Sequence, residues 1–285
     1  MNVKLTGNHA RAQVVSVAAL RSVSAEPLTR HPDDLSVEEP LEIRIAGETY
    51  ATTMRTPGQD HELVAGFLLA EGLIRSRADL GSIAHCGRLG SEGAGNTIDV
   101  LPAPGTVLDL EALGHTRRGT LTSAACGVCG RKLIDDLVLR LQRPAPSEPL
   151  ERAFIASLSD ALRDHQPGFD RTGGVHAAGI ADPGRGFRVV REDVGRHNAV
   201  DKVIGRTLLD DGLPASGSVL MVSGRTSFEI VQKALAAGLS GVVGVSAPSS
   251  LAVSTAAHFG LLLCGFARNG AFNVYAGVER LASES

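Results

Sequence analysis

The sequence of 285 residues contains no tryptophan, and aromatic side chains make up 4% of it. The core must therefore be built from Val, Leu, Ile and Ala, which a hydrophobic content of 43% can supply. The sequence also lacks an apolar run of about 18 residues and an apolar segment of the signal-peptide kind near its start. We therefore expect a cytoplasmic protein that does not insert into a membrane.

Charge and cysteine content narrow the function further. A formal net charge of -3 gives no overall positive field, so nucleic acid is not an expected partner. The four cysteines are too few and too unevenly spaced for a disulfide framework in a chain of this length. In a cytosolic protein, a pair of cysteines two residues apart is more often catalytic or metal-binding.

Such a pair is present in the C-G-V-C motif at 126–129. Apolar residues recur at helical spacing directly after it, so the motif is predicted to precede a helix at 131–141. The partial positive charge of a helix N-terminus, together with Arg131 and Lys132, favours the thiolate, which is the nucleophilic form of cysteine. We therefore predict that Cys126 and Cys129 are catalytic.

Two other uses of the pair stay open on the residues alone. A structural zinc site needs two further nitrogen or sulfur ligands, and Cys86, Cys264 and His115 are scattered along the chain. A dithiol oxidoreductase also holds its thiols at the start of a helix. The residues before this motif, 116–125, are polar, basic and small, and do not resemble the strand that such enzymes place there.

Hydrophobic periodicity divides the chain into two parts. Residues 1–13 are expected to be disordered, and 14–142 to form a smaller strand-rich domain that ends in the CxxC loop and its helix. Three prolines predict a linker at 143–150. Beyond it, in 151–285, short apolar strands alternate with helices. This alternation predicts an α/β domain in which helices cover both faces of a sheet, within a chain that is α+β overall.

The expected elements share short apolar runs at strand or helix spacing. The strands are expected at 41–45, 50–54, 83–89, 97–101, 176–181, 187–190, 219–222, 242–245, 261–265 and 272–275, and the helices from about 60 to 72 and at 154–162, 194–209, 227–237 and 251–259.

Three junctions in the α/β part carry cations beside small residues. The segment 191–202 is dense in ionisable groups and follows a strand, where open α/β folds bind ligands. The segment 223–227 precedes a helix, whose free backbone amides bind anions. In 265–270, Phe266 with Arg268 could stack a base and hold its phosphate. Each junction also has an ordinary interpretation, as a solvated helix start, an N-cap or a turn.

Several of these motifs occur together and in a specific order. They are T-P-G-Q-D-H-E-L-V-A-G-F-L-L-A-E-G-L-I at 56–74, C-G-V-C-G-R at 126–131, T-G-G-V-H at 172–176, R-E-D-V-G-R-H-N-A-V-D-K-V-I at 191–204 and S-G-R-T-S-F-E-I-V-Q-K at 223–233. This set resembles the formate dehydrogenase accessory sulfurtransferase family, FdhD. The resemblance extends from about Glu39 to the C-terminus, without departure at the cysteine motif.

The resemblance implies a homodimer that accepts sulfur from a cysteine desulfurase as a cysteine persulfide. The acceptor would be a molybdenum or tungsten cofactor with two pterin guanine dinucleotides, delivered afterwards to a formate dehydrogenase. It further implies a larger three-layer domain similar to cytidine deaminases, with Cys126 as the persulfide cysteine and Cys129 assisting. No resident metal ligands are expected. The candidate cofactor-binding residues are Arg196, His197, Ser223, Gly224, Arg225, Phe266, Ala267, Arg268, Asn269, Gly270 and Ala271.

The fold similarity raises one more alternative, a zinc nucleobase deaminase. Such an enzyme needs H-x-E followed by P-C-x-x-C. Here His176 is followed by two alanines, no proline precedes Cys126, and the cysteines come before the histidine. The absence of the deaminase motif therefore excludes this enzyme. A non-catalytic adaptor remains open, and it would tolerate the loss of both Cys126 and Cys129.

Overall fold

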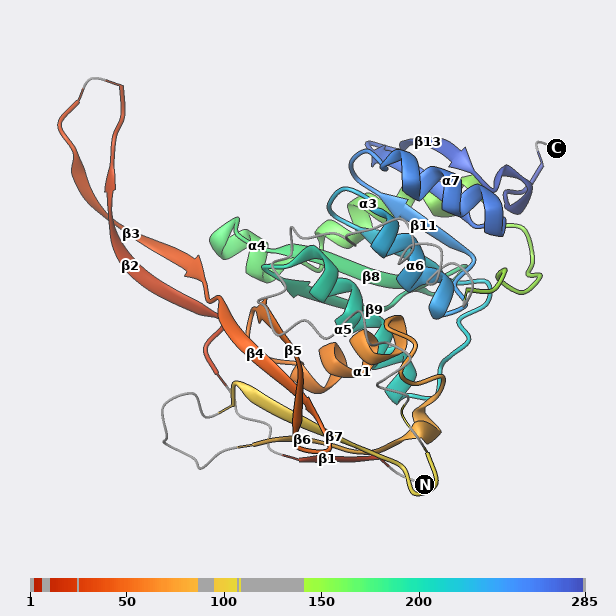
Figure 1. Ribbon diagram of the computed structural model, residues 1–285. Coiled ribbons are helices and arrows are strands. Elements are labelled where there is room, and N and C mark those ends of the chain that lie inside the picture. The colour runs from red at the N-terminus through yellow and green to blue at the C-terminus, as the bar shows by residue number, and fades with distance from the viewer. Residues whose placement is uncertain are drawn as a thin grey trace.

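The computed structural model describes residues 3–6, 11–24, 26–86, 95–106, 108 and 141–283. These residues form a mixed α/β structure with three sheets (Figure 1). The fold class predicted from the sequence is thus confirmed. The cysteine motif at 126–129 and the helix predicted at 131–141 lie outside the described residues.

The larger sheet has six strands in the order β13-β12-β11-β10-β8-β9. Its central strands β10, β11 and β12 are parallel, whereas β8, β9 and β13 each run antiparallel to a neighbour. The bounds are β8 (His176–Asp182), β9 (Gly186–Asp193), β10 (Val219–Val222), β11 (Gly241–Gly244), β12 (Leu262–Arg268) and β13 (Ala271–Ala276).

Helices cover both faces of this sheet because its strands are apolar on both sides. Val219 and Met221 pack in one cluster with α3, whereas Leu220 and Val222 pack in the other with α5, α6 and α7. The predicted three-layer arrangement is confirmed (Figure 1). The helices are α3 (Arg152–Arg163), α4 (Pro167–Thr172), α5 (Arg196–Leu209), α6 (Phe228–Ala236) and α7 (Ser250–Phe259).

The smaller sheet has five strands in the order β1-β6-β7-β4-β5. Helix α1 (Asp60–Ala70) lies between this sheet and α5 (Figure 1) and is buried along most of its length. One hydrophobic cluster therefore runs from the five-stranded sheet through α1 to the six-stranded sheet. The division at 143–150 stays a prediction, since this core crosses it. The strands are β1 (Lys4–Thr6), β4 (Glu39–Ile45), β5 (Glu48–Arg55), β6 (Leu80–His85) and β7 (Thr97–Pro102).

Helices α1 and α5 cross at glycines. A Cβ added at Gly205 would lie 1.8 Å from the carbonyl oxygen of Glu62, and one added at Gly66 would lie 2.0 Å from that of Asp201. Neither distance is compatible with a side chain, so the two backbones are in direct contact. The glycines therefore set how closely the two halves of the molecule approach.

Charged side chains are buried beside this crossing. Lys202 Nζ lies 2.7 Å from Asp193 Oδ2, and both side chains are fully buried. Lys202 also donates to the carbonyl of Thr56 at 3.0 Å, while Asp193 accepts from the backbone of Gly195 and from Asn198. The pair thus joins β9 and α5 to the end of β5, and its remaining polar atoms are satisfied.

The N-terminal segment corrects one prediction. Residues 1–13 were expected to be disordered, but β1 pairs in parallel with β6 through Lys4, Leu5 and Thr6. An edge position beside β6 supplies the backbone partners that a short strand cannot supply for itself, which is why no local pattern revealed it.

A two-stranded hairpin, which we call the arm, was not predicted either. It consists of β2 (Val14–Arg21) and β3 (Thr29–Ser36), paired antiparallel through eight residue pairs without a bulge. The arm stands away from the body of the molecule (Figure 1). Its base is held against α4 by the Arg171–Asp34 ion pair at 2.7 Å.

Candidate functional site

The candidate binding residues gather at one edge of the six-stranded sheet. The carboxyl ends of β10 and β12 lie at this edge because the two strands run parallel, each beside β11. The carboxyl end of β9 lies there too, since β9 and β10 are both antiparallel to β8. The junctions at Arg196, 223–225 and 266–271 therefore share an edge.

The edge brings together two segments that the sequence keeps apart. Ser223 Oγ accepts a hydrogen bond from the backbone of Ala177 at 2.9 Å, which fixes the start of β8 beside the end of β10. A Cβ added at Gly224 would lie 3.5 Å from His176 Nδ1 and 3.9 Å from Arg196 Cδ. The glycine therefore leaves an open position between His176, at the start of β8, and Arg196, at the start of α5.

His197 follows Arg196 in the first turn of α5. Its Nε2 lies 3.0 Å from Ser227 Oγ and 3.2 Å from Glu229 Oε2, both on or beside α6. Burial, together with the positive charges of Lys233 and Arg196, lowers the pKa of His197 to about 3. The pKa of His176 is lowered as well, by burial and then by Arg196. Both rings are therefore neutral near neutral pH, and the arginines supply the positive charge.

Several hydrogen-bond donors at this edge have no acceptor among the described residues. Arg196 Nε is buried and has no hydrogen-bond partner among the described residues. Helices α5 and α6 begin at Gly195 and Ser227 without a side-chain cap, whereas Ser249 caps α7 through the backbone of Ala252. Uncapped N-termini leave backbone N–H groups free, and these bind anions such as phosphate.

The turn between β12 and β13 extends the edge. Asn269 and Gly270 both have positive φ, which is typical of a tight two-residue hairpin turn. Phe266 also has positive φ and is exposed, as is Arg268. Ala267 differs from its neighbours because its side chain is 1% exposed and packs in the core with α3. A ligand at this turn could therefore reach the backbone of Ala267 but not its side chain.

The loop after β11 connects the turn to the first group of residues. The backbone of Phe266 donates to Ser246, and that of Thr226 donates to Ala247, each at 3.2 Å. Ser246 and Ala247 thus bind both candidate segments through the backbone.

Sequence reasoning missed three side chains at this edge. His176, Glu229 and Lys233 were not among the predicted site residues. Lys233 is buried and paired with Asp201 at 2.6 Å, an arrangement that an amphipathic helix pattern does not predict. The T-G-G-V-H stretch before β8 was the available signal for His176, but its place at the edge depends on the antiparallel pairing of β8 with β10.

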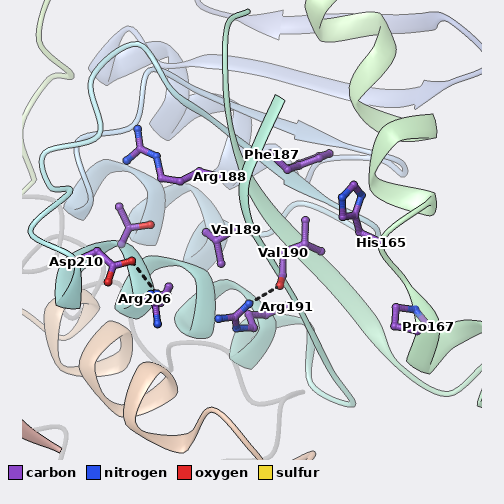
Figure 2. A pocket seen from close by; sticks show the side chains of 10 residues that line it. His165, Pro167, Phe187, Arg188, Val189, Val190, Arg191, Arg206 and Asp210 are labelled. Carbon is purple, nitrogen blue, oxygen red and sulfur yellow. Dashed lines mark hydrogen bonds and ion pairs between the residues drawn. The ribbon is translucent and has the colours of Figure 1, made fainter. Parts of the chain in front are cut away.

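A separate hollow of about 650 Å³ lies beside the edge strand β9 (Figure 2). None of the predicted site residues that the structure describes lines it. Its arginines are already paired: Arg188 binds both carboxylate oxygens of Asp182, and Arg206 binds Asp210 at 2.7 Å. This hollow is therefore a weaker anion site than the carboxyl edge, where Arg196 Nε is unpaired.

The model of the FdhD/NarQ family matches residues 36–282. The chain belongs to this family. A relative from Anaeromyxobacter dehalogenans (strain 2CP-C), named sulfur carrier protein FdhD, is 52% identical over 256 residues, which cover 87% of this chain and 88% of the relative. A relative of the same name from Streptomyces coelicolor is 46% identical over 260 residues, covering 90% and 91%.

A solved structure has the same fold. It is that of a candidate formate dehydrogenase accessory protein from Desulfotalea psychrophila, with a TM-score of 0.74 and 23% sequence identity. The match covers 95% of this chain and 100% of that one. Among the described residues, no helix is both long and apolar enough to span a membrane, and no group of histidine, cysteine and acidic side chains is arranged to hold a metal ion.

Proposed function

We propose that this protein is a cytosolic sulfurtransferase of the FdhD type. It takes sulfur from a cysteine desulfurase on Cys126 and passes it to a bis(guanine dinucleotide) molybdenum or tungsten cofactor, which a formate dehydrogenase then receives. The observation that carries the proposal is the C-G-V-C motif in a chain whose relatives are named sulfur carrier proteins.

The loading step needs a thiolate and a sulfur donor. Cys126 as thiolate attacks the outer sulfur of the donor's cysteine persulfide. The sulfur–sulfur bond of the donor breaks, and its cysteine leaves as a thiolate. Cys126 then carries one additional sulfur atom as a persulfide. No external oxidant or reductant is consumed, because one persulfide is exchanged for another.

The release step requires two electrons if the sulfur leaves as sulfide. The proposed source of these electrons is Cys129, which two residues separate from Cys126 in the sequence. Its thiolate attacks the inner sulfur of the Cys126 persulfide, a disulfide forms between the two cysteines, and hydrosulfide departs. The two cysteines must then be reduced before the next cycle, for which a cellular dithiol suffices.

The carboxyl edge of the six-stranded sheet fits the nucleotide part of such a substrate. The unpaired Nε of Arg196 and the uncapped starts of α5 and α6 can receive phosphate oxygens. Gly224 leaves room beside His176 and Arg196, while the exposed ring of Phe266 and the guanidinium of Arg268 offer stacking and charge at the turn. When bound, the substrate supplies the metal that accepts the sulfur.

Mass spectrometry after incubation with a cysteine desulfurase and cysteine tests the proposal. We expect the wild type to gain the mass of one sulfur atom at Cys126. The Cys126→Ser variant should lose this gain, whereas the Cys129→Ser variant should load sulfur and retain it. A gain on neither cysteine would contradict the sulfur-carrier role.

A CxxC dithiol oxidoreductase is the alternative function. It predicts reduction of a protein disulfide that needs both Cys126 and Cys129, with no added sulfur on either. Turbidity of insulin in the presence of a dithiol, measured for the wild type and for both serine variants, separates the two functions.

A further inference from the structure

The two strands of the arm differ in what they expose. Strand β2, V-V-S-V-A-A-L-R, carries a single charge, at Arg21. Strand β3, T-R-H-P-D-D-L-S, carries Pro32, Asp33 and Asp34. Proline and charged residues prevent an edge strand from pairing with another chain. The edge of β3 is thus protected, whereas the edge of β2 is not.

The apolar side chains of β2 are also exposed. Val15 is 47% exposed, and Leu20 is 62% exposed. Among the described residues, β2 pairs with β3 alone. An isolated two-stranded hairpin is marginally stable in water, and a third or fourth strand removes this weakness. The arm therefore has an unpaired strand edge, and pairing at this edge would stabilise it.

We propose that β2 pairs antiparallel with β2 of a second copy of this chain, so that the two arms form a four-stranded sheet in the order β3-β2-β2-β3. The proposal does not rest on the sulfur-transfer function. It also concerns a segment that lies almost entirely outside residues 36–282, which the family model matches.

The sequence of β2 is compatible with its own antiparallel copy. With Val17 at the twofold axis, Val14 lies opposite Leu20 and Val15 opposite Ala19 of the second copy. Ser16 then faces Ala18, the remaining pair of this register. Opposite residues share a face of the sheet, as a twofold axis perpendicular to the sheet requires.

The charge of β2 selects the antiparallel orientation. Arg21 lies at the outer end of the strand, so antiparallel pairing places the two arginines at opposite ends of the new interface. Parallel pairing would place them directly opposite each other, which is unfavourable. The shared edge of β2 is consumed in the pairing, and the outer edges that remain are those of β3. Because β3 is protected by Pro32 and two aspartates, the assembly closes as a dimer and does not grow into a fibre.

The mass of the full-length protein in solution, measured by light scattering over a wide range of concentration, tests the proposal. We expect a dimer for the wild type. The Val17→Lys substitution should raise the dimer dissociation constant at least about tenfold, because it removes the central apolar pair and places two lysines opposite each other. The matched control is Val278→Lys, the same change at an exposed valine away from the arm, which should leave the dimer intact.

Disulfide trapping tests the register. Two cysteines opposite each other in an antiparallel pair have Cα atoms about 4.5 to 5.5 Å apart, which suits a disulfide. Val17→Cys should therefore form a cross-link between two copies, identified by mass spectrometry of the linked peptide. Asp33→Cys, on β3 directly opposite Val17 within the arm, should not. A wild type that is monomeric throughout, a dimer unaffected by Val17→Lys, or trapping at residue 33 and not at residue 17 would each overturn the proposal.

Discussion

The α1–α5 crossing and the arm distribute polar and apolar groups in opposite ways. At the crossing, Lys202 and Asp193 are fully buried as an ion pair and glycines allow direct backbone contact. In the arm, valines and leucines are exposed and the strand edge has no partner among the described residues. The crossing is complete within one chain, whereas the arm, in the pairing proposed above, is completed by a second chain. Substitutions at the crossing should therefore change folding, and substitutions in the arm should change association.

Loss of the buried ion pair is the largest expected effect. Lys202→Met leaves the carboxylate of Asp193 buried without its counter-charge, and we expect the free energy of unfolding to fall by about 3 to 5 kcal/mol. Urea unfolding followed by circular dichroism measures it. The control, Arg163→Met, removes an exposed partner of Asp170 and should cost less than about 1 kcal/mol. Equal losses in the two variants would show that burial does not determine how much the ion pair contributes to the free energy of unfolding.

The backbone contact between α1 and α5 at Gly205 has the next largest expected effect on stability. Gly205→Ala introduces a Cβ that would lie 1.8 Å from the carbonyl oxygen of Glu62, so α1 and α5 must separate. We expect a loss of about 3 kcal/mol in the free energy of unfolding, despite the better helix propensity of alanine. Gly224→Ala is the control, because its Cβ would have ordinary contacts at 3.5 Å. A stable Gly205→Ala variant would mean that the helices are not held at this distance.

The pH dependence of stability should respond to His197. Its pKa is about 3 in the folded protein and 6.5 in the unfolded chain, so the unfolded state binds the proton first. The stability that this neutral ring contributes is present above pH 6.5 and is lost as the pH falls towards 3. Between about pH 7 and pH 5, the free energy of unfolding of the wild type should therefore fall by about 2 kcal/mol more than that of His197→Gln.

Urea unfolding of the wild type and of His197→Gln at both pH values measures this difference. Burial raises the pKa of Asp201 to about 6, which gives a pH dependence of the opposite sign, but that contribution is common to both proteins and cancels. The exposed His258→Gln variant serves as the control. Parallel curves for His197→Gln and the wild type would contradict the prediction.

The same contrast explains what the sequence could predict. Strand β10 and helix α6 were predicted because four apolar residues and an amphipathic repeat are local signals. The arm was missed because Pro32, Asp33 and Asp34 give β3 a poor local strand signal, and its pairing with β2 is an arrangement of two segments. Strand β1 was missed for the same reason, since its partner β6 lies far along the chain.

The candidate site follows this division as well. The junctions after β9 and β10 could be predicted, since residues that follow parallel strands of a sheet meet at one edge. The place of His176 could not, because it depends on β8 running antiparallel to β10. Nor could the buried Lys233–Asp201 pair, which joins α5 to α6 across their packed faces. The roles of Cys126 and Cys129 stay predictions, since both residues lie outside the described part of the chain.

The smallest expected effect is on the stability of the arm's own protomer. Val17→Lys replaces an exposed valine that packs against no core, so the free energy of unfolding of the monomer should change by less than about 0.5 kcal/mol. Urea unfolding at concentrations where the wild type is monomeric measures this, and Val278→Lys is again the control. Because the same substitution should weaken the dimer at least about tenfold, a large loss of monomer stability would place the apolar face of β2 in the fold of one chain and not between two.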